Sequence, residues 1–155
     1  MRDYEKKDAM TKEISTMLCA KEYEVAEAVG RLKNEQTRMK SQIAELQQKL
    51  LKFCVAEIPV DEKIVTVFDG SLSGNLPREM MNQLLDKGAV ICAVFAGTDE
   101  EGYRYVIGSR SEDVRSISKT LNSTLEGRGG GKPEMVQGSV KGTEDAVKEI
   151  IARYQ

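Results

Sequence analysis

One apolar heptad pattern limits the folds open to this chain more than any other feature of its sequence. Between residues 22 and 57, apolar side chains recur at alternating spacings of four and three residues, which is typical of a helix with one buried seam. One seam position is polar, Gln36, and can fix the register or the number of helices. The seam positions are Val25, Val29, Leu32, Gln36, Met39, Ile43, Leu46, Leu50 and Phe53. The pattern predicts a long helix whose seam must pack against another helix.

A shorter helix is predicted at about residues 3–18, with Met10, Ile14 and Met17 on one face. At ~1.5 Å per residue it spans about half the length of the longer helix. An antiparallel hairpin would let it cover the N-terminal half of the seam. The rest of the seam would pack on a second copy, in parallel or antiparallel orientation, or on another part of a larger protein. The residues expected to mediate self-association are Leu32, Met39, Ile43, Leu46, Leu50 and Phe53.

Glycine and proline are unevenly distributed along the chain. Residues 1–58 contain a single glycine, Gly30, and no proline, whereas residues 59–155 contain every other glycine and all three prolines. Because both residue types interrupt regular structure and mark turns, the shift predicts a domain boundary near Pro59. We therefore expect a helical segment at 1–58, forming a long helical hairpin or coiled coil, and a globular domain at 59–155.

The second part alternates between strand and helix patterns. Strands are predicted at 63–68, 89–96 and 103–108, of which the second is apolar throughout, as in a central strand. Helices are predicted at 76–87, at 112–125 with Ser111 as N-cap, and from Thr143 to the end. This order, with an optional further strand between the last two helices, predicts an α/β fold with a small mixed β-sheet and helices packed on it.

The chain has 155 residues, no histidine, and three cysteines that are far apart in the sequence. Without histidine, Ser-His-Asp and Cys-His catalysis and His-ligated metal sites are excluded. The odd number of cysteines predicts free thiols in a reducing compartment. No apolar run approaches the ~20 residues that span a bilayer, and the N-terminus lacks a signal-peptide pattern. We therefore expect a cytoplasmic protein with no membrane partner and no cofactor of its own.

A glycine-rich, basic segment, predicted to be a loop, covers residues 127–142. Three consecutive glycines, Gly129, Gly130 and Gly131, lie between Arg128 and Lys132. Glycine lets backbone N–H groups approach an anion closely. The flanking cations, with Lys141 further on, then favour a phosphate ligand, most simply a nucleic-acid backbone. Since the whole chain has a net charge of −2, such binding must use a local patch.

Two known phosphate motifs do not fit this segment. A Walker loop needs serine or threonine after the Gly-Lys pair, and here Pro133 follows Lys132. The dinucleotide fingerprint needs glycine at its sixth position. If the motif starts at Gly127 that position is Lys132, and if it starts at Gly129 that position is Glu134. The segment must therefore bind phosphate in another way, or be a structural turn.

Residues 129–138 resemble the signature of the DHH-associated domain. This domain is the C-terminal module of alanyl-tRNA synthetases and of the longer free-standing alanyl-tRNA editing proteins. The family pattern is a glycine run followed by Lys or Arg, Pro, an acid, Met, a small residue and Gln. The sequence meets every position except the small residue, where it has Val136. The helical stretch from Ile14 to Leu32 resembles the segment that joins the editing domain to this module.

This resemblance implies a tRNA-binding and oligomerisation module, with tRNA-Ala as the first candidate partner and a homodimer formed through the long helix. The parent protein would be an alanyl-tRNA synthetase or a hydrolase of mischarged alanyl-tRNA. Zinc would be needed only in an upstream editing domain, which this histidine-free sequence lacks, so the chain alone is expected not to be catalytic. The residues implied to contact RNA are Arg128, Gly129, Gly130, Gly131, Lys132 and Lys141.

Three other functions compete with this one. In DHH phosphoesterases a related C-terminal domain holds oligonucleotides or cyclic dinucleotides, but there the glycine run is usually followed by histidine, where this chain has Lys132. A plain dimerisation module would need only the heptad seam. A catalytic role for Asp69 and Ser71, which follow a strand, has the weakest support of these functions, because ordinary turn chemistry explains both residues.

Overall fold

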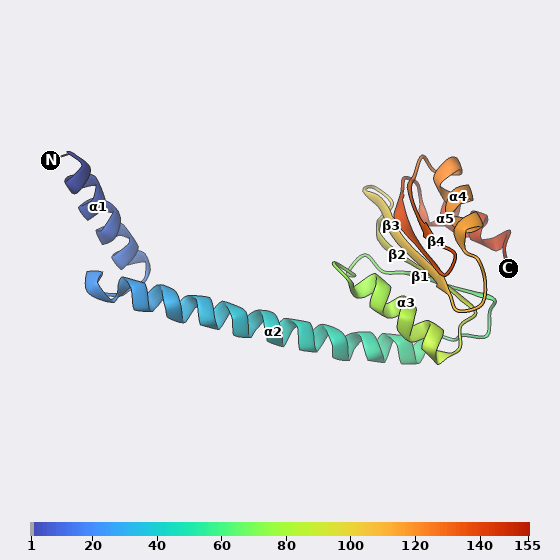
Figure 1. The fold of residues 1–155 in the computed structure, drawn as a ribbon, viewed down its shortest axis with the longest axis horizontal. Coiled ribbons are helices and arrows are strands. Elements are labelled where there is room, and N and C mark those ends of the chain that lie inside the picture. Colours follow the sequence, from blue (N-terminus) through green and yellow to red (C-terminus); the bar gives the residue numbers. More distant parts are fainter. Residues whose placement is uncertain (1) are drawn as a thin grey trace. The chain divides into compact units, whose positions relative to one another are not determined.

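The computed structural model describes residues 2–155. It divides into two compact units, one up to Lys49 and the other Leu50–Gln155. Its elements are α1 (Arg2–Met17), the 3-10 turn η1 (Glu22–Glu24), α2 (Val25–Glu57), β1 (Ile64–Phe68), α3 (Leu76–Lys87), β2 (Ile91–Thr98), β3 (Gly102–Ser109), α4 (Arg115–Thr124), β4 (Arg128–Lys132), β5 (Met135–Val140) and α5 (Glu144–Ala152). A long N-terminal helix and a mixed sheet with helices confirm the predicted α/β class (Figure 1).

The long helix is present, and its heptad seam faces solvent. α2 runs without interruption for 33 residues. Val25 is half-buried, and the other apolar seam residues of α2 range from 48% exposed at Val29 to 72% exposed at Phe53. α1 buries none of its residues, so it does not cover the seam as the hairpin arrangement required. The reason lies in its composition, because charged residues fill its first half and leave too few apolar residues for a continuous packing face.

The five strands form one sheet in the order β1-β2-β3-β5-β4. β1 runs parallel to β2, and all the other neighbours are antiparallel. The expected loop at 127–142 is wrong, since most of this segment is the hairpin β4–β5 at one edge of the sheet. The prediction failed because a strand of sequence Arg-Gly-Gly-Gly-Lys has neither β-branched residues nor apolar alternation.

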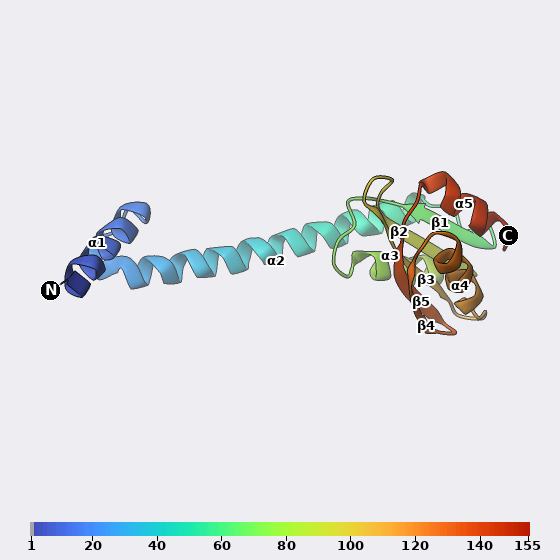
Figure 2. The ribbon, with the colours of Figure 1, turned by 90° about the horizontal axis from the view of Figure 1, so that it is seen from above.

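Helices cover both faces of the sheet (Figures 1 and 2). Because side chains alternate along a strand, each strand contributes to two separate cores. Phe95 and Tyr105 lie in the core under α4 and α5, whereas Cys92 and Val94 lie in the core under α3. The central strand β2 is buried on both faces over most of its length, as predicted from its uniformly apolar sequence.

The last turns of α2 belong to the globular unit. Leu51 is 3% exposed and Val55 is 7% exposed, and both join the core under α3. The Nζ atom of Lys87 donates hydrogen bonds to the carbonyl oxygens of Val55, Ala56 and Ile58, at 2.9, 2.7 and 2.6 Å. Terminal helix carbonyls have no partner within their own helix. Lys87, at the end of α3, therefore fixes the C-terminus of α2 on the globular unit, which begins before Pro59.

Three predicted helix ends can be compared with the structure. Gly88 ends α3 with a positive φ of 121°, as expected of a C-terminal glycine. Thr143 caps α5, and its side chain accepts a hydrogen bond from the Ala146 N–H. The N-cap predicted at Ser111 is wrong, because α4 begins only at Arg115. The N–H groups of Ser111 and Glu112 instead donate to the Ser109 hydroxyl, which makes this segment a turn.

Candidate nucleic-acid interface

The glycine run lies on β4, an edge strand whose five residues are all exposed. β4 pairs only with β5, so its other edge faces no strand of the sheet. Alternation along the strand divides its residues between two faces. Gly129 pairs with Gly138, which pairs with Tyr105 of the core under α4, so Gly129 and Gly131 face the α4 side. Arg128, Gly130 and Lys132 face the α3 side.

Packing, rather than a ligand, explains two of the three consecutive glycines. A Cβ atom at Gly129 would lie 2.7 Å from the Tyr105 hydroxyl oxygen, and it would also meet the backbone of Gln137. A Cβ atom at Gly131 would meet the Met135 carbonyl oxygen. At Gly130, however, a Cβ atom would have no heavy atom within 4 Å. Gly130 is therefore the residue of the run where a ligand can approach the backbone freely.

A hydrogen-bond network ties the start of β4 to α4. The Tyr105 hydroxyl donates to Oδ1 of Asn122 at 3.0 Å and lies 2.7 Å from the Ser118 hydroxyl, which can donate to it. The Asn122 side-chain amide donates in turn to the Gly129 carbonyl oxygen at 3.2 Å. Tyr105 is 1% exposed, so this network lies beneath the hairpin. It holds the glycine backbone in one position against the helix.

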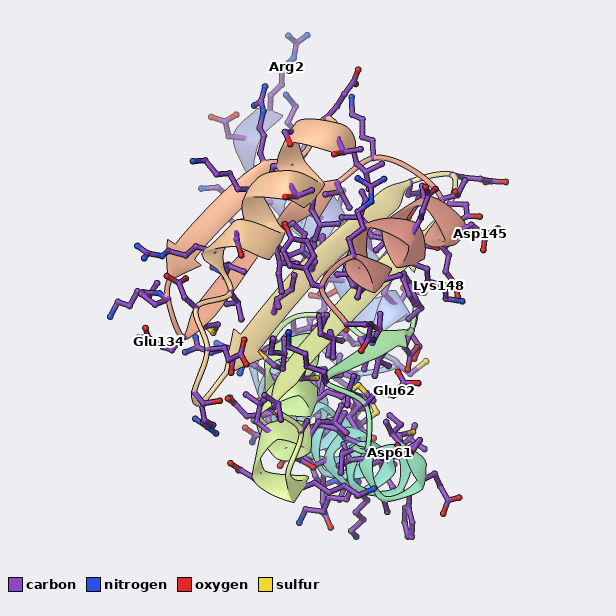
Figure 3. All side chains as sticks on the ribbon, turned by 90° about the vertical axis from the view of Figure 1, so that its right-hand side faces the viewer. Arg2, Asp61, Glu62, Glu134, Asp145 and Lys148 are labelled. Atoms are coloured by element: carbon purple, nitrogen blue, oxygen red, sulfur yellow. The ribbon has the colours of Figure 1, made fainter. Side chains whose placement is uncertain are left out.

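The tip of the hairpin is also fixed. The Val114 N–H donates to the Pro133 carbonyl at 2.9 Å, and the Ser109 N–H donates to the Glu134 carbonyl at 3.0 Å. Figure 3 shows Glu134 at the tip, across the sheet from Asp145 and Lys148 of α5. Because both ends of β4 are anchored, the hairpin is preorganised, and binding a ligand there loses little conformational entropy.

The predicted cations do not form a single cradle. Arg128 and Lys141 share a hollow of about 450 Å³ at the base of the hairpin. Lys132 lies at the tip, where it lines a separate hollow of about 520 Å³. Within residues 2–155, none of the three cations belongs to an ion pair. The structure therefore spreads unneutralised positive charge along the whole hairpin.

Two further arginines, which were not predicted from the sequence, belong to this surface. Arg104 of β3 lines the hollow that contains Arg128, and Arg78 of α3 lines the hollow that contains Lys132. A signal for Arg104 exists in the sequence, since it lies between Tyr103 and Tyr105, which alternation places in the core. No comparable local signal marks Arg78, because its proximity to β4 depends on tertiary packing.

The residues considered for chemistry elsewhere have structural roles. Oδ1 of Asp69 accepts hydrogen bonds from the Ser71 N–H at 2.8 Å and from the Ser71 hydroxyl at 2.6 Å, which is a local turn. Burial raises the pKa of Cys92 to about 12, so its thiol stays protonated at neutral pH. The described residues contain no group of three or more metal-ligating side chains, and no helix among them is long and apolar enough to cross a membrane.

The globular unit matches a known domain family. Residues 61–155 match the DHHA1 domain, so the chain belongs to the DHHA1 domain family. This match confirms the resemblance suggested by residues 129–138. The matched segment begins at Asp61, within the connection between α2 and β1, and it includes every strand of the sheet.

The chain is also similar to parts of alanine–tRNA ligases. The ligase of Streptococcus mutans is 27% identical over 161 residues, covering 96% of this chain and 18% of the ligase. The ligase of a Psychrobacter species is 24% identical over 156 residues, covering 93% of this chain and 17% of the ligase. This chain thus spans less than a fifth of the length of either relative. Both similarities include the N-terminal helices as well as the DHHA1 domain.

Among solved structures, the chain resembles RecJ from Thermus thermophilus, determined in complex with Mg²⁺. The TM-score is 0.58 at 16% sequence identity, and the match covers 91% of this chain and 21% of RecJ. At this level of identity the likeness establishes a shared fold and nothing about activity.

Proposed function

We propose that this chain is a tRNA-binding and oligomerisation module of an alanyl-tRNA synthetase, or of a hydrolase that acts on mischarged alanyl-tRNA, with tRNA-Ala as its first candidate partner. The similarity to alanine–tRNA ligases over nearly the whole chain supports this proposal. The chain itself would not be catalytic. Any zinc-dependent hydrolysis would take place in another part of the parent protein, since this chain lacks histidine ligands. We propose that the parent protein is cytoplasmic.

The observation that carries the RNA-binding proposal is the anchored, basic hairpin. Arg128 and Lys132 are exposed and belong to no ion pair within residues 2–155. Gly130, between them, leaves its backbone open to an approaching group. Cations that meet phosphates release counterions, which makes the affinity fall as salt concentration rises. An RNA backbone therefore matches both the charge and the open backbone of β4.

The oligomerisation proposal rests on the exposed seam of α2. Leu32, Met39 and Ile43 are 53%, 49% and 55% exposed. The seam continues with Leu46, Leu50 and Phe53, which are 64%, 63% and 72% exposed. An apolar stripe of this length on a solvated helix, interrupted at Gln36, is typical of a surface that packs against a partner helix. We propose a homodimer formed through this seam.

Direct binding measurements test the proposed function. Fluorescence anisotropy would compare tRNA-Ala, a non-cognate tRNA and a cyclic dinucleotide across a salt series. Salt-sensitive binding of tRNA, with tRNA-Ala bound most tightly, is the expected result. Selective binding of the cyclic dinucleotide would instead identify a phosphoesterase substrate domain. No binding of any of the three would leave only the dimerisation role.

A further inference from the structure

We infer that RNA crosses the sheet face on the α3 side, where Arg104 and Arg78 bind its phosphates together with Arg128 and Lys132. This inference rests on the proposed function and specifies which side of the glycine hairpin meets RNA. It also adds two phosphate-binding residues from β3 and α3, outside the glycine-rich segment.

The strand register places two arginines on the same face. Arg104 pairs with Ser139 on the neighbouring strand, and Ser139 pairs with Arg128 on the next. Directly paired residues point to the same side of a sheet. Adjacent strands lie about 4.8 Å apart, so the Cα atoms of Arg104 and Arg128 lie about 10 Å apart on one surface. Ser139 lies between them and is itself exposed. This row presents two positive charges and a hydroxyl group to solvent.

Three neighbouring hollows extend this row along the hairpin. The first, of about 450 Å³, contains both Arg104 and Arg128. The second, of about 380 Å³, also contains Arg104 and reaches Gln137. The third, of about 520 Å³, contains Gln137 too and ends between Arg78 and Lys132. Because each hollow shares a lining residue with the next, the three lie in a row from the base of the hairpin to its tip, and we call this row the trough.

The charge in this trough is predominantly positive and unneutralised. Arg78 and Arg104 are exposed, and within residues 2–155 neither belongs to an ion pair. Arg110 also lines the third hollow, but it is paired with Asp86 at 2.8 Å. The negative groups along the trough are Glu101, Glu126 and Glu134. They are outnumbered by Arg78, Arg104, Arg128, Lys132 and Lys141. The trough is therefore complementary to a polyanion.

The opposite side of the glycine run is a weaker candidate. There a hollow of about 760 Å³ lies between α4 and the glycines. Its two cations are Arg115, which is paired with Asp113 at 2.6 Å, and Lys119. Its other polar lining consists of hydroxyl and amide groups. Within the part of the chain that the structure describes, Lys119 is thus the one cation lining this hollow that belongs to no ion pair. Charge complementarity favours the α3 side.

The composition of the trough also indicates what part of the RNA it binds. The aromatic residues that line it, Tyr103 and Tyr105, are 5% and 1% exposed, so neither offers a ring face for stacking. Recognition of unstacked single-stranded bases depends on such faces. The trough therefore suits the sugar–phosphate backbone of folded RNA, with little dependence on base sequence.

The test compares Arg104→Gln and Arg78→Gln with Lys119→Gln in the full chain, using transcribed tRNA-Ala across a salt series. All three residues are exposed, so unchanged thermal unfolding is expected to verify folding. The two arginine variants should each weaken binding and reduce the slope of log K against log salt by roughly 0.7–0.9. Lys119→Gln should match the wild type in both measurements.

Including Arg128→Gln and Lys132→Gln separates this inference from the proposed function. If these two variants lose affinity while Arg104→Gln and Arg78→Gln do not, RNA binding by the hairpin holds and the trough is wrong. A loss confined to Lys119→Gln would place RNA on the α4 side and overturn the inference. If the wild type binds no tRNA, the proposed function and this inference both fail.

Discussion

The hydroxyl oxygen of Tyr105 lies 2.7 Å from the position that a Cβ atom would occupy at Gly129. The same oxygen lies 2.7 Å from the Cβ position of Gly138, which pairs with Gly129. A buried tyrosine thus requires glycine on both strands of the hairpin. Packing over Tyr105 and an open backbone at Gly130 are two separate reasons for glycine in one short run.

We predict that Gly129→Ala destabilises the globular unit, whereas Gly130→Ala does not. At Gly129 the added methyl group meets Tyr105 and the adjacent backbone, an overpacking that costs about 1–3 kcal/mol. At Gly130 the methyl group enters open space, so a change within about 0.5 kcal/mol is expected. Urea unfolding of both variants at one protein concentration measures the difference. Equal stability of the two variants would contradict the packing explanation.

Gly130→Ala also probes the approach of RNA to the backbone. If a phosphate group contacts the β4 backbone at Gly130, the methyl group should weaken tRNA binding while the unfolding midpoint stays unchanged. Wild-type affinity in this variant would mean that the side chains of the neighbouring cations make the contact alone. The unfolding measurement on the same sample serves as the control.

Lys87→Met should loosen the junction between α2 and the globular unit. The ammonium group donates to three carbonyl oxygens at the C-terminus of α2, and methionine keeps a stem of similar length without the charge. We expect a loss of about 1 kcal/mol in unfolding free energy. Lys52→Met, on the exposed side of the same helix, is the matched control. An equal loss in both variants would show that the carbonyl contacts contribute nothing.

Leu46→Lys should dissociate the proposed dimer. A lysine in an apolar seam desolvates a charge without a partner, so dimerisation should weaken at least tenfold, or ~1.4 kcal/mol. Gln47→Lys adds the same charge beside the seam and should leave the dimer intact. Sedimentation equilibrium of the three proteins measures the outcome. A monomeric wild type would contradict the oligomerisation proposal.

The free energy of unfolding should depend on pH through Cys92. Burial raises the pKa of its thiol from 9.0 to about 12 in the folded protein. Below pH 9 the thiol is protonated in both states and has no effect. Above pH 9 the unfolded chain loses the proton first, so stability falls as pH rises toward 12. Cys92→Ala should flatten this part of the profile in urea titrations, and an unchanged slope would contradict the assignment.

The sequence predicted those elements whose side chains follow a clear period. The heptads of α2 and the apolar run of β2 left little ambiguity. The hairpin β4–β5 was predicted as a loop because Gly129 and Gly131 carry no side chain that would show a strand period. The contact that requires glycine at Gly129 comes from Tyr105 on another strand, far away in the sequence. The packed end of α2 was missed because Leu51 and Val55 form a second stripe beside the longer seam.

The candidate site was predicted in part for the same physical reason. Arg128 and Lys132 flank an obvious glycine run, so their exposure on the hairpin was accessible from the sequence. Their positions at opposite ends of β4 could not be predicted, because this segment was expected to be a loop and is a hairpin instead. Arg78 joins the same surface only through the packing of α3 on the sheet.

The salt dependence of tRNA binding in an Arg128→Ala/Lys132→Ala double variant tests the central claim most directly. Anisotropy titrations with tRNA-Ala would compare it with the wild type and with Lys63→Ala, an exposed cation outside the hairpin. We predict that the double variant loses affinity and that its slope of log K against log salt falls by roughly 1.4–1.8. Lys63→Ala should match the wild type. A double variant with the wild-type slope would contradict phosphate binding by the hairpin.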